Sequence, residues 1–155
     1  ELIEAVRKGR KEEFKAFHSE GEVPDPQSEE TFERSKLNWS DLNAKPHDTM
    51  LAYYKALISL RKTNEFLKNP DRQNLKANVY AHKILCLQRT NETKEQSCYL
   101  NFSNQLQQLE EISHENDWEL IFNSADQLYG GKLDVDHDTL LPHAIKIYER
   151  PIKNQ

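Results

Sequence analysis

The sequence predicts an α+β fold in which helices come first and a small antiparallel β-sandwich follows. Through the first 70 residues, apolar side chains recur every three or four positions, which is the period of an amphipathic helix. From residue 77 onward they alternate with polar ones, as in a strand. We therefore divide the chain at this change of period into a helical segment, 1–72, and an all-β domain, 73–155.

Two helices are expected near the N-terminus. The first covers residues 2–17, where one apolar stripe lies opposite a charged face. It ends before the 21–26 segment, because residues that precede proline are pushed out of the α region. Ser28 is placed to cap a short second helix near 31–36, with glutamates in its first turn.

A longer third helix is expected after Pro46, with Asp48 as its cap and Asn69-Pro70 at its end. Its apolar face should carry five large side chains together with Arg61. The five are Met50, Leu51, Tyr54, Leu57 and Ile58.

The β domain shows four strand-like stretches, at 79–89, 98–102, 118–122 and 144–148. Asn91-Glu92 lies between the first two with the spacing of a hairpin turn. The polar segment between residues 104 and 116 is expected to be a long loop. Trp118 is interpreted as a core residue of this domain rather than a platform for a sugar.

Composition excludes several classes of function. The chain has 155 residues, with 21 basic and 26 acidic side chains and a formal charge of −5, so nothing favours nucleic-acid binding. No apolar run is long enough for a membrane span, and the first residues do not resemble a signal peptide. Cys86 and Cys98 are expected to be reduced, near each other if their strands pair, and to fit a cytoplasmic location. Because the sequence has no initiator Met, we expect a piece of a longer protein.

The residues alone indicate no chemistry. The acidic run 134–138 begins like a calcium loop, but Thr139 and Ile145 stand where an EF-hand needs Gly and Glu. The six histidines are scattered without the spacing of a metal site. Only four glycines occur, which excludes a glycine-rich phosphate loop, so neither a metal nor a cofactor is expected. No pair of carboxylates, nucleophilic serine or Cys–His arrangement suggests a catalytic group.

One part of the chain carries a family resemblance. Residues 5–17 (AVRKGRKEEFKAF), 23–27 (VPDPQ) and 31–39 (TFERSKLNW) resemble malto-oligosyltrehalose trehalohydrolases, a branch of the α-amylase superfamily of retaining glycoside hydrolases. The helix 54–61 (YKALISLR) is similar to the last barrel helix of that superfamily in general. The segments YLNFS and YGG, at 99–103 and 129–131, resemble the β-domain that follows such barrels.

The resemblance implies that the helices are the end of a (β/α)8 barrel and its last connection. The family cleaves the α-1,4 bond next to the terminal trehalose of maltooligosyl-trehalose and so releases trehalose. Its catalytic carboxylates come from earlier strands and have no counterpart here, so this chain alone should be inactive scaffold. Because barrel active sites open where such connections lie, Asp25, Gln27 and Trp39 are candidate substrate-binding residues. The alternative is that they only pack the connection against the barrel.

Without the rest of the barrel, the apolar helix faces would lack their partner. We expect them to repack on the β-domain, to self-associate or to be mobile. Two other identities stay open. One is the same region of another α-amylase relative, such as a branching or debranching enzyme, and the other is a free-standing glucan-binding module.

Overall fold

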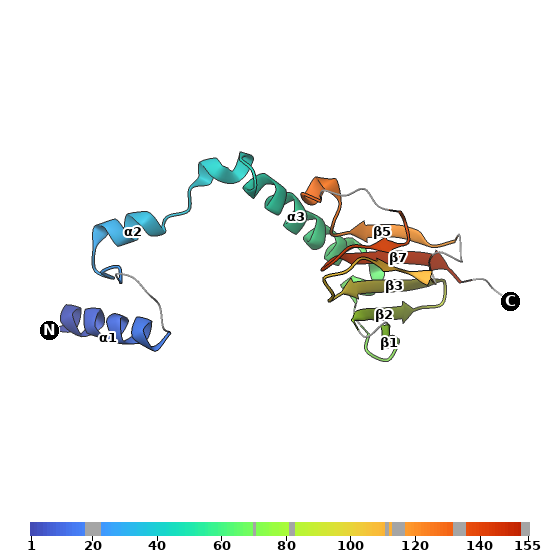
Figure 1. The fold of residues 1–155 in the computed structure, drawn as a ribbon, viewed down its shortest axis with the longest axis horizontal. Helices are drawn as coiled ribbons and strands as arrows, with labels where there is room; N and C mark the ends of the chain where they lie inside the picture. Colours follow the sequence, from blue (N-terminus) through green and yellow to red (C-terminus); the bar gives the residue numbers. More distant parts are fainter. Residues whose placement is uncertain are drawn as a thin grey trace. The chain divides into compact units, whose positions relative to one another are not determined.

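The computed structural model confirms the α+β class, with helices first and an antiparallel sheet after them (Figure 1). It divides into two compact units, Glu1–Asp41 and Leu42–Gln155, which are described separately. The residues that the structure describes are 1–17, 23–69, 71–80, 83–110, 112, 117–131 and 136–152.

The first unit contains α1 (Leu2–Ala16) and α2 (Glu29–Ser35), so both expected helices are confirmed. The Ser28 side chain accepts a hydrogen bond from the backbone N–H of Glu30, as its predicted capping role requires. Neither helix buries a single residue. The large apolar side chains that these two helices and their flanks expose are Leu2, Ile3, Val6, Phe17, Phe32 and Leu37.

A short 3-10 helix, η1 (Trp39–Asn43), leads into α3 (His47–Thr63) and the single-turn α4 (Glu65–Lys68). The prediction of one helix up to Asn69 is therefore wrong. Asn64 has an extended backbone that ends α3, and its side chain caps α4. Asp48 is not the cap of α3, because Pro46 occupies that position and the Asp48 carboxylate accepts from the N–H of Thr49 instead.

The second unit is built on a five-stranded antiparallel sheet in the order β1-β2-β3-β7-β5. The predicted turn between β2 and β3 is confirmed, because Asn91 and Lys94 share a backbone hydrogen bond there. A second sheet joins the two-residue strands β4 and β6. The strands are β1 (Leu75–Tyr80), β2 (Ile84–Thr90), β3 (Lys94–Asn101), β4 (Gln107–Gln108), β5 (Glu119–Asn123), β6 (Thr139–Leu140) and β7 (Ile145–Pro151).

The two faces of the large sheet are covered differently. On one side, which we call the loop-covered face, the segments around β4 and β6 close the main core over Tyr99 and Tyr148. The remaining members of that core are Ile84, Cys86, Leu109, Ile112, Trp118, Leu140 and Ala144. The predicted core position of Trp118 is thus confirmed, and the Arg150 guanidinium lies 4.2 Å from the centre of its ring.

The opposite side is the helix-covered face, where α3 and α4 contact the sheet. Tyr53 of α3 lies 6.1 Å from Phe122 of β5, measured between ring centres, and Asn64 bonds Glu149 of β7. These contacts place both helices in the same compact unit as the strands. The expected domain boundary between residues 72 and 73 stays a prediction. Within the described chain, no helix combines the length and apolarity that a membrane span requires.

Cys86 and Cys98 lie on the paired strands β2 and β3, as predicted, and no disulfide joins them. Cys86 is opposite Tyr99 in the register, whereas Cys98 is opposite Leu87. Because side chains alternate along a strand, the two sulfurs point to opposite faces of the sheet. The fold therefore keeps the thiols apart even though their strands are adjacent.

Candidate functional site

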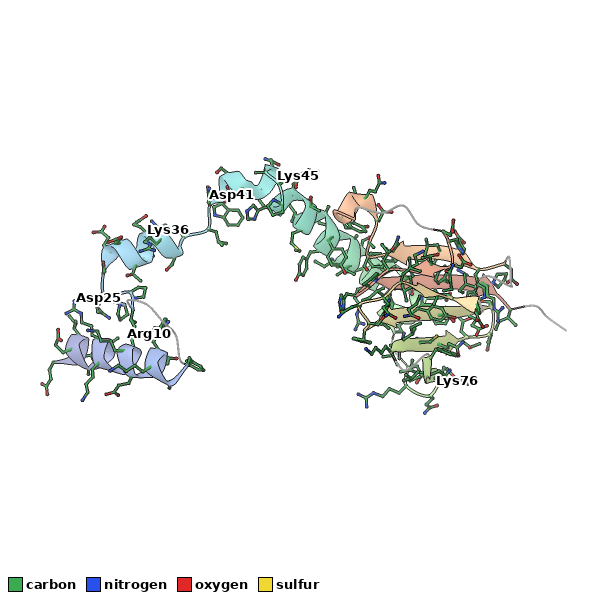
Figure 2. All side chains as sticks on the ribbon, viewed as in Figure 1. Arg10, Asp25, Lys36, Asp41, Lys45 and Lys76 are labelled. Atoms are coloured by element: carbon green, nitrogen blue, oxygen red, sulfur yellow. The ribbon has the colours of Figure 1, made fainter. Side chains whose placement is uncertain are left out.

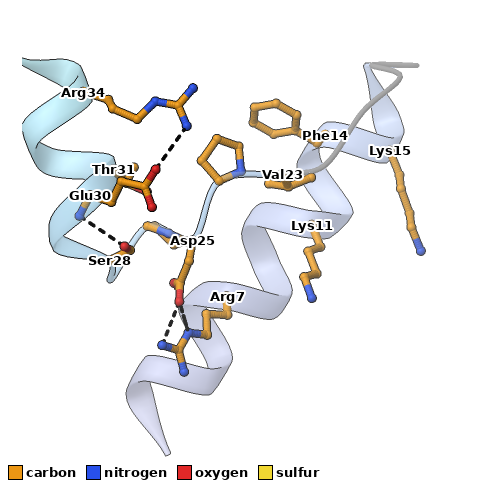
Figure 3. Close-up of a pocket in the computed structure, with 12 residues that line it drawn as sticks. Arg7, Lys11, Phe14, Lys15, Val23, Asp25, Ser28, Glu30, Thr31 and Arg34 are labelled. Atoms are coloured by element: carbon orange, nitrogen blue, oxygen red, sulfur yellow. Dashed lines mark hydrogen bonds and ion pairs between the residues drawn. The ribbon is translucent and has the colours of Figure 1, made fainter.

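The candidate site in the first unit is an open groove of about 710 Å³ between α1, the 23–28 segment and α2 (Figure 3). We call it the α1–α2 groove. Phe14, Val23 and two prolines give it apolar walls, while charged side chains from both helices reach its rim. Of the three predicted substrate-binding residues, only Asp25 lines it.

Asp25 is held by an ion pair with Arg7 of α1. The Arg7 Nε lies 3.0 Å from each carboxylate oxygen, and a second guanidinium nitrogen lies 2.8 Å from Oδ2 (Figure 3). Asp25 Oδ1 also accepts from the backbone N–H of Gln27 at 3.0 Å. Arg7, and to a smaller extent this backbone bond, lowers the pKa of the Asp25 carboxyl below its ordinary value. Asp25 is thus an ionised carboxylate that links the 23–28 segment to α1.

Among the described residues that line the groove, four are basic and two are acidic, although the whole chain carries a negative charge. Arg34 lies 3.8 Å from the second of these two carboxylates, that of Glu30. Both carboxylates therefore face an arginine (Figure 3). The basic residues are Arg7, Lys11, Lys15 and Arg34.

This arrangement is unsuited to acid–base hydrolysis. A retaining glycosidase needs a carboxylic acid with a raised pKa, and a second carboxylate about 5 Å away as nucleophile. In the groove the pKa of Asp25 is shifted in the opposite direction. Among the described residues, no group of His, Cys, Asp and Glu side chains is arranged to hold a metal ion.

Gln27 and Trp39 lie outside the groove lining. Gln27 is next to Asp25, to which it contributes only its backbone N–H, and its exposed side chain makes no hydrogen bond within the described parts of the chain. Trp39 opens η1, and 71% of its surface is exposed. The structure therefore brings Gln27, but not Trp39, to the carboxylate of Asp25.

The basic residues of the groove were not predicted as a site. From sequence, the run of Arg and Lys in α1 (Figure 2) is interpreted as a solvated helix face, but three of its side chains, those of Arg7, Lys11 and Lys15, line the groove. Arg7 differs because it pairs with a carboxylate 18 positions later. No local spacing signals a pair of that separation.

No family model matches the chain. A malto-oligosyltrehalose trehalohydrolase from Deinococcus radiodurans is 46% identical over 77 residues, which is 48% of this chain and 13% of that protein. One from Mycobacterium tuberculosis is 40% identical over 72 residues, covering 45% of this chain and 12% of the relative. The resemblance to the trehalohydrolases is confirmed.

Solved structures extend the likeness to nearly the whole chain. A putative α-amylase from Salmonella typhimurium matches 97% of this chain and 24% of its own, with a TM-score of 0.67 and 25% identity. An α-amylase from H.orenii matches 85% of this chain and 26% of its own, with a TM-score of 0.52 and 17% identity, which shows the shared fold alone. The trehalohydrolase and α-amylase similarities together support a glycoside hydrolase family. The matches to the trehalohydrolases span about an eighth of the length of those proteins.

Proposed function

We propose that this chain is the C-terminal part of a trehalohydrolase: the last helices of its (β/α)8 barrel and the β-domain that follows. The whole protein would hydrolyse the α-1,4 bond adjacent to the terminal trehalose of maltooligosyl-trehalose and release trehalose. The identity of 46% with the Deinococcus radiodurans trehalohydrolase is the observation that carries this proposal.

The helix surfaces support a scaffold role. No residue of α1 or α2 is buried, although both carry large apolar side chains. α3 packs on the sheet through Tyr53 but leaves Met50, Tyr54 and Ile58 exposed. Such exposed apolar surface is typical of an interface, and the remainder of the barrel is the partner we propose. In the absence of that partner, we propose that the chain associates with itself through the same surfaces.

The groove chemistry supports a chain without its own catalytic pair. Asp25 faces Arg7, which lowers the pKa of its carboxyl, so it lacks the environment of a general acid. We propose that the nucleophile and the acid–base carboxylate lie in the rest of the protein. Asp25, Gln27 and Trp39 remain our candidates for the rim of the sugar site.

The cellular location is also proposed. No disulfide joins Cys86 and Cys98, and reduced cysteines are typical of a reducing compartment. We therefore propose the cytoplasm as the location of the whole protein.

The test is a chimera. In the Deinococcus radiodurans enzyme, the segment that aligns with this chain is replaced by the corresponding residues of this chain, and trehalose release from maltooligosyl-trehalose is measured. In the matched control, the same segment is replaced by an equally long, structurally equivalent segment of an α-amylase. We expect the first chimera to stay active and the control chimera to lose most activity.

The isolated 155-residue chain is assayed beside the chimeras. It should release no trehalose, because catalysis by this class of enzyme lowers the barrier by about 8–23 kcal/mol and needs both carboxylates. Hydrolysis by the chain alone would contradict the scaffold role. An inactive but folded first chimera would contradict the trehalohydrolase assignment.

A further inference from the structure

A second pocket, of about 390 Å³, lies within the second unit on the loop-covered face of the sheet. Its floor is formed by Tyr80, Ile84 and Tyr99, and its wall includes Gln107, Gln108 and Glu110. The volume is in the range of small-molecule sites. No predicted site residue belongs to it.

The strand register explains why the floor is open. Tyr80 of β1 pairs with Ile84 of β2, and Cys86, two positions along the same strand, pairs with Tyr99 of β3, so the three floor side chains share one face. Leu109, next to β4, shares the core with Ile84 and Tyr99, which are 3% and 2% exposed. Tyr80 on the edge strand β1 is 42% exposed.

The wall offers both hydrogen-bond donors and hydrogen-bond acceptors, and other bonds hold them in position. Gln108 Oε1 accepts from the Thr139 hydroxyl at 2.8 Å, and Gln107 Nε2 donates to the Ser103 hydroxyl at 3.3 Å. Each amide is therefore held at one end. Within the described chain, the Gln108 amino group and the Gln107 carbonyl oxygen make no hydrogen bond, which leaves one donor and one acceptor group for a ligand.

The charge of the pocket restricts the ligand class. Among the described residues that line the pocket, Glu110 is the only charged one and none is basic. An anion such as a phosphate ester would meet a carboxylate and no compensating cation from these residues. A neutral ring with apolar C–H faces and adjacent hydroxyl groups matches an aromatic floor beside amide groups, because each hydroxyl both donates and accepts.

We propose that this pocket binds one glucose unit of an α-glucan chain, with the sugar ring against Tyr80 and its hydroxyls on the Gln107 and Gln108 amides. The choice of an α-glucan rests on the proposed function, whereas the saccharide class follows from the pocket itself. The site would bind part of the α-glucan substrate to the β-domain of the protein.

The test is an NMR titration of the full ¹⁵N-labelled chain with maltotriose. Saturable shifts should appear at β1, at the start of β2 and at β4. Tyr80→Ala should weaken binding roughly tenfold, since it removes the exposed half of the aromatic floor. Val79→Ala is the matched control, because Val79 is exposed on the same strand and points to the other face.

If Tyr80→Ala perturbs the fold, Gln108→Ala provides the second variant and should weaken binding several-fold without touching the floor. Glucose 6-phosphate should bind no more tightly than glucose. Equal effects of the two strand variants, tighter binding of the phosphate ester, or shifts confined to other surfaces would each overturn the proposal.

The two proposals fail separately. An active chimera combined with no maltotriose binding would remove the pocket site and leave the trehalohydrolase assignment standing. Maltotriose binding that depends on Tyr80, combined with an inactive chimera, would support the saccharide site and remove the assignment.

Discussion

Replacing Asn64 with alanine should destabilise the second unit by about 2.5–4 kcal/mol, because its side-chain amide both caps α4 and bonds to two strands of the sheet. Its Oδ1 accepts from the backbone N–H groups of Phe66 and Leu67, both at 3.2 Å, and so caps α4. The same oxygen accepts from Gln96 Nε2 at 2.9 Å, and its Nδ2 donates to Glu149 Oε1 at 2.5 Å.

The magnitude follows from these four bonds. Loss of an asparagine cap costs about 1 kcal/mol. Loss of a hydrogen bond to a carboxylate costs about 1.5–3 kcal/mol, and Glu149 is only 8% exposed. Gln96 adds little, since its amide keeps a 3.0 Å bond to Glu149 Oε1. The sum is a large part of the roughly 5–15 kcal/mol that a domain has in total.

The assay is urea unfolding followed by circular dichroism, with the slope of the transition compared between variants. Asn78→Ala is the matched control, because Asn78 is exposed and its side chain makes one hydrogen bond within the described chain, to Gln88 at 3.2 Å. It should cost less than about 0.5 kcal/mol. Equal midpoints for the two variants would refute the reasoning. Asn64→Asp, which keeps the cap but sets a second carboxylate against Glu149, should also destabilise.

Three further predictions concern other parts of the chain. Arg7→Gln should return the pKa of Asp25 toward its ordinary value in a carboxyl NMR titration. Because the folded pKa is lowered, this contact stabilises the first unit at neutral pH and is lost as the pH falls through that pKa; an unchanged titration would contradict the ion pair. Burial raises the pKa of the Cys98 thiol to about 11, so a thiol reagent at neutral pH should modify it slowly in the native chain and quickly in urea, where Cys86 also reacts. Ile3→Glu should shift sedimentation of the isolated chain toward the 18.2 kDa monomer; a chain that is monomeric without the substitution would refute self-association.

Periodicity predicted most of the fold because α1, α2 and α3 each carry a continuous helical pattern and conventional end residues. The break at Asn64 was missed because the residues around it are good helix formers, and only the long-range bonds to Gln96 and Glu149 favour a cap there. Part of strand β1 was missed because nearly all of its residues are exposed. Its sequence therefore shows no clear alternation of apolar and polar side chains.

Alternation was also a poor guide to the faces of β3. Cys98 and Leu100 form its apolar series, yet the neighbouring Tyr99 and Asn101 are the more buried pair. Both faces of the sheet are covered, and Asn101 is satisfied there by carbonyl groups, including that of Leu141 at 3.0 Å. A polar residue with such partners is indistinguishable from a surface residue in sequence.

Neither site could be found from the sequence beyond Asp25. The α1–α2 groove depends on the Arg7–Asp25 pair, and the sheet pocket depends on which strands are neighbours. Both features depend on contacts between residues that are far apart in the sequence. The family resemblance located the connection around Asp25, but it did not indicate that an arginine holds this carboxylate.

The place of β7 in the sheet affects how the chain folds as it leaves the ribosome. β7 is the last strand in sequence, yet it lies between β3 and β5, and it is the only strand paired with β5 among those described. The β1–β3 meander can form early, whereas β5 must wait for residues 145–151. Until then, two open strand edges are available to other nascent chains. A chain that stops short of Ile145 would keep those edges and become a substrate for chaperones or proteases.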